Sequence, residues 1–191
     1  ITSLMYLDNQ KCNDTISDKE GNIIGNLADK WNWIDPVTLD VTIRPNVTFH
    51  NGEPCTSDDV FFTFDRILSG FGDGTIAVLY DTLDSVEIID DLTVRFHLKE
   101  PDSAFENRLG SVWGANIVPH DYLEAIGNDA FQKAPVGTGP YKVTDYQSGA
   151  SVTLEAKDDY WAEGTDHQSI RQCANVQKIL YKVVSEPTQN A

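Results

Sequence analysis

The sequence predicts an α+β fold in which the strands pair mainly antiparallel. Three patterns support this class: a helix with a capping sequence at residues 56–68, a pair of alternating segments at 86–98, and further alternating segments on either side of these. A sheet of this kind with a few short helices belongs to the α+β class. No internal repeat or low-complexity stretch interrupts the pattern.

The first strand is predicted from strict alternation after the Asp35-Pro36 turn. Leu39, Val41 and Ile43 alternate with polar residues, which is the pattern of a half-buried strand. Residues 47–49 are expected to form a further short strand. His50-Asn51-Gly52 should close it as a turn, because Asn-Gly readily adopts positive φ.

The clearest helix follows directly. Thr56 and Asp59 have the spacing of a capping box, and apolar residues then recur at helical spacing up to Leu68. A glycine-rich loop ends this helix, and residues 75–83 are expected to form a second, short one.

The remaining elements are read in the same way. Residues 86–89 and 93–98 predict a hairpin about the Asp90-Asp91 turn. Short helices are expected at 105–109 and 119–126, the second stopped by Gly127. After a tight loop at 135–140, strands are expected at 141–146, 152–156 and 176–184.

Composition limits the function classes. The chain has 191 residues, 30 acidic and 14 basic side chains and a net charge of -16. A surface this acidic disfavours nucleic acid and anionic membranes as partners. Hydrophobic residues at 40% exclude global disorder, and no apolar run approaches the ~18 residues of a membrane span. Without an initiator Met or a signal peptide, the chain is interpreted as a processed or excised fragment.

No local pattern predicts catalysis, a metal site or a cofactor. Cys12, Cys55 and Cys173 lack metal-ligand spacing, and one disulfide plus a free thiol or three free thiols both remain open. The glycine-rich loop at 135–140 lacks a dinucleotide or P-loop fingerprint and is interpreted as a turn that leads into a strand. The histidines show no ligand spacing, and His50 in particular is expected to be solvated.

Paired carboxylates leave one enzymatic alternative. A hydrolase acting on peptides or glycans could use Asp58, Asp59, Asp158 and Asp159. Each pair falls at an expected cap or turn, where Asp is favoured for backbone hydrogen bonding. We therefore expect no enzyme activity.

The order of the motifs resembles that of the peptide- and nickel-binding solute receptors of ABC importers. The resemblance rests on residues 27–31 (LADKW), 47–54 (VTFHNGEP), 56–64 (TSDDVFFTF), 134–142 (APVGTGPYK) and 158–161 (DDYW). Because several motifs match in the same order, the probability that the similarity arises by chance is very small. The resemblance extends from about Gly21 to Thr188.

The resemblance implies a lobe of the type II periplasmic-binding-protein kind. Residues 1–54 and 135–191 would form the discontinuous core of this first lobe around one mixed sheet. Residues 55–134 would form an inserted subdomain of helices and a hairpin. The second lobe of the family is expected to be absent from this chain.

The resemblance also indicates which residues face a ligand. The loop before residue 117 and the short helix before the hairpin contribute to the cleft in the family. Here these positions are Trp113, Ala115 and Asn116, and Ile76 and Tyr80. Trp113 could stack on a ligand side chain and Asn116 could hydrogen-bond a peptide backbone. The alternative is that Trp113 packs in the core and Asn116 caps a loop.

The function implied is capture of short peptides for an ABC importer, without catalysis, cofactor or metal. The expected partners are a small peptide or other solute and the permease subunits, and the protein is expected to be a monomer. Its location would be periplasmic or cell-surface, with a lipid anchor left open. Alternatives are a receptor for a nickel chelate or a sugar, and a ligand-sensing domain.

Overall fold

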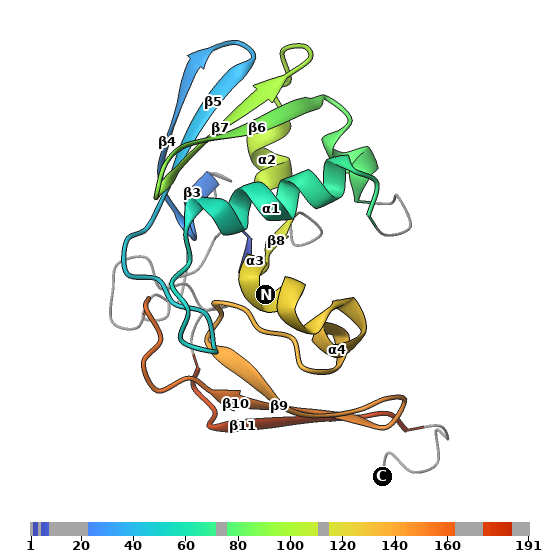
Figure 1. Cartoon of the computed structure of the whole chain (residues 1–191). Helices are drawn as coiled ribbons and strands as arrows, with labels where there is room; N and C mark the ends of the chain where they lie inside the picture. The colour runs from blue at the N-terminus through green and yellow to red at the C-terminus, as the bar shows by residue number, and fades with distance from the viewer. Residues whose placement is uncertain are drawn as a thin grey trace.

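The structure, a computed structural model, describes residues 2–3, 5–7, 23–71, 76–110, 115–162 and 174–184. Within these residues, one sheet has four strands and a second has three. Figure 1 shows the four-stranded sheet at the top, the three-stranded sheet at the bottom, and helices α1, α3 and α4 between them. All strand pairs in these residues are antiparallel, and the predicted α+β class is confirmed.

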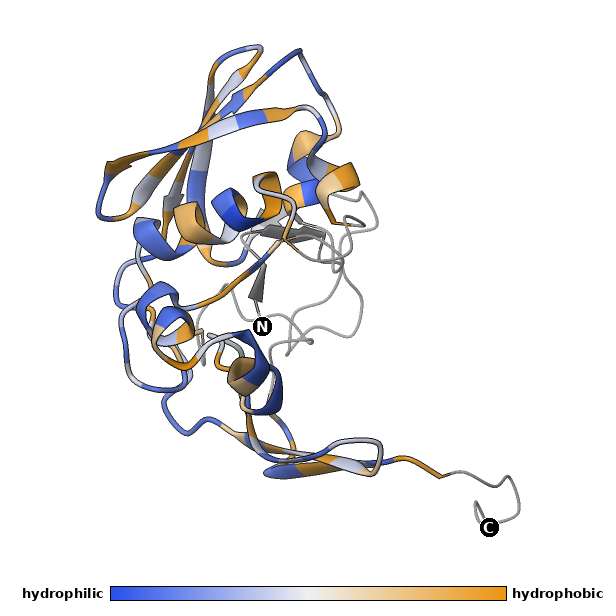
Figure 2. Cartoon of the chain, turned by 45° about the vertical axis from the view of Figure 1, so that its right-hand side comes forward, coloured by the Kyte–Doolittle hydropathy of each residue, from blue (hydrophilic) through white to orange (hydrophobic). Residues whose placement is uncertain are grey.

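The four-stranded sheet is built from two hairpins. Strands β4 (Ala28–Asp35) and β5 (Thr38–Ile43) form one, and β6 (Leu83–Asp90) and β7 (Thr93–Leu98) form the other. The order is β4-β5-β7-β6, so residues far apart in the chain meet where β5 pairs with β7. Apolar and polar residues alternate along these strands (Figure 2), as the sequence predicted for β5 and for the second hairpin.

Helix α1 (Ser57–Leu68) covers one face of this sheet. The predicted capping box is present, with the Thr56 backbone N–H donating to Asp59 Oδ2 at 2.8 Å. Phe64, on the buried side of the helix, meets the rings of Phe96 and Tyr80 edge-on at centroid distances of 4.9 and 5.2 Å. The apolar spacing in the sequence therefore places α1 on the core.

Shorter elements complete the fold. They are the 3₁₀ helix η1 (Ala77–Tyr80), α2 (Phe105–Leu109), α3 (His120–Ile126) and α4 (Asn128–Lys133). Strand β8 (Asn116–Ile117) pairs with β1 (Thr2–Ser3), and β2 (Met5–Leu7) pairs with β3 (Ile23–Gly25). Gly127 ends α3 as predicted, with φ of 75°. No helix among the described residues is long and apolar enough to cross a membrane.

The three-stranded sheet contains β9 (Tyr141–Gln147), β10 (Ser151–Ala156) and β11 (Lys178–Lys182), in the order β11-β10-β9. The three predicted strands are thus confirmed, with β11 shorter than expected. Several large apolar side chains on this sheet are exposed, including Tyr146, Leu180 and Tyr181. Figure 1 shows no described element below β11.

A junction of two loops connects the two sheets. The His50 backbone N–H donates to Gly137 O at 2.9 Å, and the His50 ring bonds to Gly139 O at 2.8 Å. Lys157, beyond β10, donates to Thr48 Oγ1 at 3.0 Å. The Trp161 indole donates to Thr138 O at 2.9 Å. The turn at 50–52 and the loop at 135–140 are therefore packed together, although the sequence predicted them only as separate turns.

Three predictions need correction. The strands before Pro54 pair with β7 of the 55–134 segment and not with β9–β11, so the two outer segments do not share one mixed sheet in the described residues. Residues 47–49 form only an isolated bridge, Thr48 to Pro54, because the chain turns back between these two residues. The helix expected at 75–83 is the four-residue η1, and β6 begins at Leu83.

Candidate ligand-binding site

Tyr80 joins the two segments that the sequence analysis placed at the cleft. Its hydroxyl donates to Arg108 O at 3.2 Å and accepts the Ala115 backbone N–H at 2.9 Å. The side chain is 1% exposed, and burial raises the pKa of the hydroxyl to about 12. Tyr80 therefore belongs to the core and fixes the backbone of Ala115, which is also buried.

Arg108 is itself held in place by Asp102. The Asp102 carboxylate accepts hydrogen bonds from Thr82 Oγ1 at 2.7 Å, from the Ala104 N–H at 3.0 Å and from the Arg108 guanidinium. Burial acts to raise the pKa of Asp102, but these donors outweigh it and the pKa lies below its ordinary value. Asp102 thus joins α2 to Thr82, the residue just before β6.

Among the described residues that the sequence predicted to face a ligand, Ile76 and Asn116 have side chains accessible to solvent. Ile76 is 44% exposed at the start of η1, and its neighbour Val78 is 70% exposed. Asn116 is half-buried on β8, where its backbone lies opposite Ser3 of β1. Trp113 lies outside the described residues. The structure thus links Tyr80 to Ala115 directly, whereas the side chains of Ile76 and Asn116 are accessible to solvent.

The four carboxylates of the hydrolase alternative lie in two separate parts of the fold. Asp59, at the start of α1, is 7% exposed and accepts the backbone N–H groups of Thr56 at 2.8 Å and His120 at 2.9 Å. Burial raises its pKa, partly offset by these donors. Asp158 and Asp159 are exposed beyond β10. No hydrogen bond or ion pair joins the two pairs within the described part of the chain.

Asp59 and Asp58 instead connect α1 to α3. Asp58 Oδ2 lies 2.6 Å from His120 Nδ1, and Glu124 Oε1 lies 3.5 Å from His120 Nε2. The imidazole stacks on Phe62 with ring centroids 3.9 Å apart. Burial acts to lower the pKa of His120, but the two carboxylates outweigh it and the pKa is raised. Both Asp residues therefore have a structural position.

The described residues contain neither a metal-binding cluster nor a reactive thiol. Among them, no three His, Cys, Asp or Glu side chains lie close enough to hold a metal ion. Cys55 is a buried free thiol, and burial raises its pKa far above the range of a reactive thiolate. Cys12 and Cys173 lie outside the described residues, so their pairing stays open.

The fold and the motif order define a lobe of a solute receptor, and comparison with known proteins gives its family. Residues 22–191 match the bacterial extracellular solute-binding proteins, family 5. The chain belongs to this family. The peptide- and nickel-receptor resemblance of the motifs is thereby confirmed.

Individual relatives show the same relationship. The oligopeptide-binding protein AppA of Bacillus subtilis is 33% identical over 184 residues, which covers 93% of this chain and 32% of AppA. Its solved structure with a nonapeptide superposes with a TM-score of 0.75 at 31% identity, covering 96% of this chain and 34% of that one. MoaA of A. tumefaciens, solved with mannopinic acid, has a TM-score of 0.79 at 25% identity, covering 98% and 35%. The chain spans about a third of the length of these relatives.

Proposed function

We propose that the full protein captures short peptides outside the cytoplasm and delivers them to the permease of an ABC importer. The observation that carries this proposal is the agreement with AppA in both sequence and backbone, over almost all of this chain. Binding would be non-catalytic, and it would close a second lobe over the ligand. The protein would act as a monomer at the cell surface or in the periplasm.

In this lobe, the proposed contacts come from Trp113, Asn116 and Ile76. Ile76 would supply apolar surface, and the Asn116 amide would donate to and accept from a peptide backbone. Ala115 would line the same loop with its backbone held by Tyr80, whose hydroxyl is already occupied by two protein groups. Peptide binding therefore depends on Tyr80 through the position of residue 115.

A receptor for another solute of the same family is the second candidate. It is favoured by the similarity to MoaA, whose structure is described with mannopinic acid. Native mass spectrometry of the full-length protein, purified without added ligand, separates the two. A ladder of extra masses at peptide spacing supports peptide capture, whereas a single discrete adduct supports one defined solute.

Two variants test the proposed contacts by calorimetric titration of the full-length protein with an oligopeptide. Ile76→Ser and Asn116→Ala should each weaken binding about 5- to 30-fold, the effect of losing one apolar or hydrogen-bonding contact. Ile34→Ser, at a 53% exposed position on β4, is the matched control and should leave affinity unchanged. Unchanged affinity in both test variants would remove these residues from the proposed site.

A further inference from the structure

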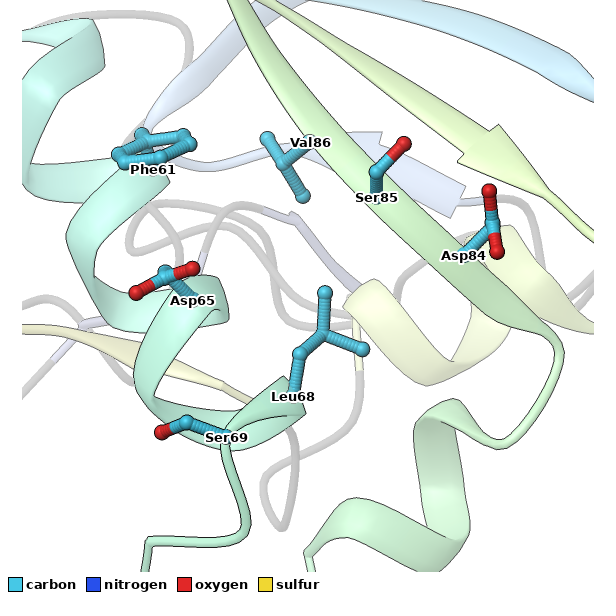
Figure 3. Close-up of a pocket in the computed structure, with 7 residues that line it drawn as sticks. All are labelled: Phe61, Asp65, Leu68, Ser69, Asp84, Ser85 and Val86. Atoms are coloured by element: carbon cyan, nitrogen blue, oxygen red, sulfur yellow. The ribbon is translucent and has the colours of Figure 1, made fainter.

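Helix α1 carries two different rows of side chains outside its buried face. Figure 3 shows the row on the side of β6, which lines a surface pocket and consists of Phe61, Asp65 and Leu68. Asp58, Phe62 and Arg66 form a second row, because every fourth residue of a helix lies on the same stripe. This second row contacts α3 and α4.

The α3–α4 pair has little buried apolar surface to hold it in place. Among the residues of these two helices, Leu123 alone is buried. The helices contact each other through the rings of Tyr122 and Phe131, whose centroids lie 6.3 Å apart. Because apolar burial is small, the packing of this pair on α1 depends on the polar and aromatic contacts of the second row.

His120, the first residue of α3, makes three of these contacts with its side chain. The imidazole stacks on Phe62 with centroids 3.9 Å apart and ring planes 20° apart. Its Nδ1 lies 2.6 Å from Asp58 Oδ2 on α1, and its Nε2 lies 3.5 Å from Glu124 Oε1 on α3. Each ring nitrogen therefore faces a carboxylate oxygen.

Only the protonated imidazole matches both carboxylates. An ionised carboxylate can only accept hydrogen bonds, and a neutral imidazole carries one N–H, so its other nitrogen would present a lone pair to an oxygen. The imidazolium carries an N–H on each nitrogen, and its positive charge also favours the stack on Phe62. Loss of the proton from His120 therefore weakens the contact between α3 and α1.

The charged groups around this ring are mainly acidic. In the described residues they are Asp58, Asp59 and Arg66 on α1 and Glu124 on α3. Arg66 lies 5.3 Å from the Phe62 ring and donates to Asn128 Oδ1 at 2.7 Å, at the start of α4. Its charge opposes protonation of His120. Burial also acts to lower the pKa of His120, but Asp58 and Glu124 outweigh it and the pKa lies above its ordinary value of 6.5.

We propose that the α3–α4 pair is held on α1 by a pH-dependent latch of Asp58, Phe62, His120 and Glu124, which is closed while His120 is protonated. In mildly acidic solution the latch keeps both helices against α1. As the pH rises through the His120 pKa, residues 120–133 open more often as a local unit. None of the latch residues is among the proposed ligand contacts, so this device does not depend on the proposed function.

Hydrogen exchange of the full-length protein, followed by mass spectrometry between pH 5.5 and 8.5, tests the latch. After correction for the intrinsic exchange rate at each pH, the protection of residues 120–133 should fall about two- to five-fold towards alkaline pH, the effect of a partly exposed ion pair. The midpoint of this fall should coincide with the His120 titration measured by NMR of ¹³C-labelled histidine. Protection that does not change with pH would overturn the proposal.

Substitutions identify the group that titrates. His120→Gln should bring the protection of residues 120–133 at pH 5.5 down to the alkaline level of the parent and remove the pH dependence. Asp58→Asn should shift the midpoint to lower pH. His97→Gln is the matched control, because His97 on β7 also faces a carboxylate, Glu87 at 3.3 Å, and it should keep the pH dependence of the parent. Full pH dependence in His120→Gln, or its loss in His97→Gln, would overturn the proposal.

Discussion

Asp59 shows how a single buried residue organises two helices. Its carboxylate accepts one backbone N–H at the start of α1 and another at the start of α3. An acidic group at a helix N-terminus also interacts favourably with the helix dipole. Asp59 thus accepts a hydrogen bond from one backbone N–H at the start of each helix, where N–H groups lack partners within the helix.

Asp59→Asn should lower the free energy of unfolding by about 1–3 kcal/mol. An amide keeps one acceptor, but its NH₂ group faces a backbone N–H and the negative charge is lost. Urea denaturation at pH 7 measures the change. Asp145→Asn, at an exposed position on β9, should change the free energy of unfolding by less than about 0.5 kcal/mol. Similar values for both variants would contradict the role of Asp59.

Two histidines should respond to pH with opposite sign. Burial lowers the pKa of His50 in the folded state, so stability falls as pH decreases below its unfolded pKa of about 6.5. The raised pKa of His120 means that its contribution is present below about pH 6.5 and is lost as pH rises through the folded value.

Single variants separate the two histidines. Urea midpoints between pH 5.5 and 7.5 should lose less stability towards acid in His50→Gln than in the parent protein. The His120→Gln variant should lose less stability towards alkaline pH. Parallel pH profiles for the parent and both variants would show that neither imidazole contributes.

The residue scale is also where sequence analysis was least informative. His50 was expected to be solvated because it precedes Asn-Gly, yet its ring partners lie 87 and 89 residues away. Tyr80 was predicted at the cleft, and its hydroxyl is instead used by Arg108 and Ala115. Burial and hydrogen-bond partners of this kind depend on contacts that no local spacing contains.

At the scale of elements, prediction was more successful where periodicity is strong. Alternation located β5 and β7, and the capping box with apolar spacing located α1. The prediction that the segments before Pro54 and after Pro135 share one sheet was wrong, because the alternation of a strand fixes its buried face but not its neighbour. Helix α4 was missed because it is only six residues long and none of them is buried, so no apolar spacing marks it.

Gly127 gives a prediction at this scale. It joins α3 to α4 with φ of 75° and ψ of 164°, a region accessible almost only to glycine. Gly127→Ala should lower the free energy of unfolding by about 1–3 kcal/mol. A new Cβ would meet no atom within 4 Å, so the cost is conformational and not steric.

Asparagine provides the discriminating comparison. Gly127→Asn should lower the free energy of unfolding by at least as much as Gly127→Ala. Asparagine tolerates the left-handed helical region, but the ψ of 164° at Gly127 lies outside that region. Ala125→Ser on the exposed face of α3 is the control, with a cost of a few tenths of a kcal/mol. Rescue by asparagine in thermal denaturation would contradict the backbone explanation.

At the scale of the whole molecule, hydrogen bonds and ring contacts around His50 and Trp161 connect the two sheets. The Trp161 indole bonds Thr138 O, and its ring lies 5.9 Å from the Arg44 guanidinium. Arg44 in turn donates to Asn26 O and Asp29 at the start of β4. One chain of contacts therefore extends from the loop before β9 to the first strand of the upper sheet.

Trp161→Phe should lower the free energy of unfolding by about 1–3 kcal/mol, through the lost hydrogen bond and reduced packing. Amide hydrogen exchange should accelerate at His50 and Gly137 more than at Val94 in β7. Tyr181→Phe, at an exposed position on β11, should leave both rates unchanged. Uniform acceleration across the chain would indicate global destabilisation and contradict a local junction.

The open side of β11 has a consequence for the behaviour of the chain in solution. Among the described residues, β11 pairs with β10 alone, and a free strand edge with exposed leucine and tyrosine is a template for intermolecular pairing and fibril growth. Lys178, which pairs with Glu155 at 3.2 Å, and Lys182 flank this apolar stretch. Charged side chains at the ends of an apolar edge strand disfavour pairing with another chain, and here they occur in a chain whose charge elsewhere is overwhelmingly negative.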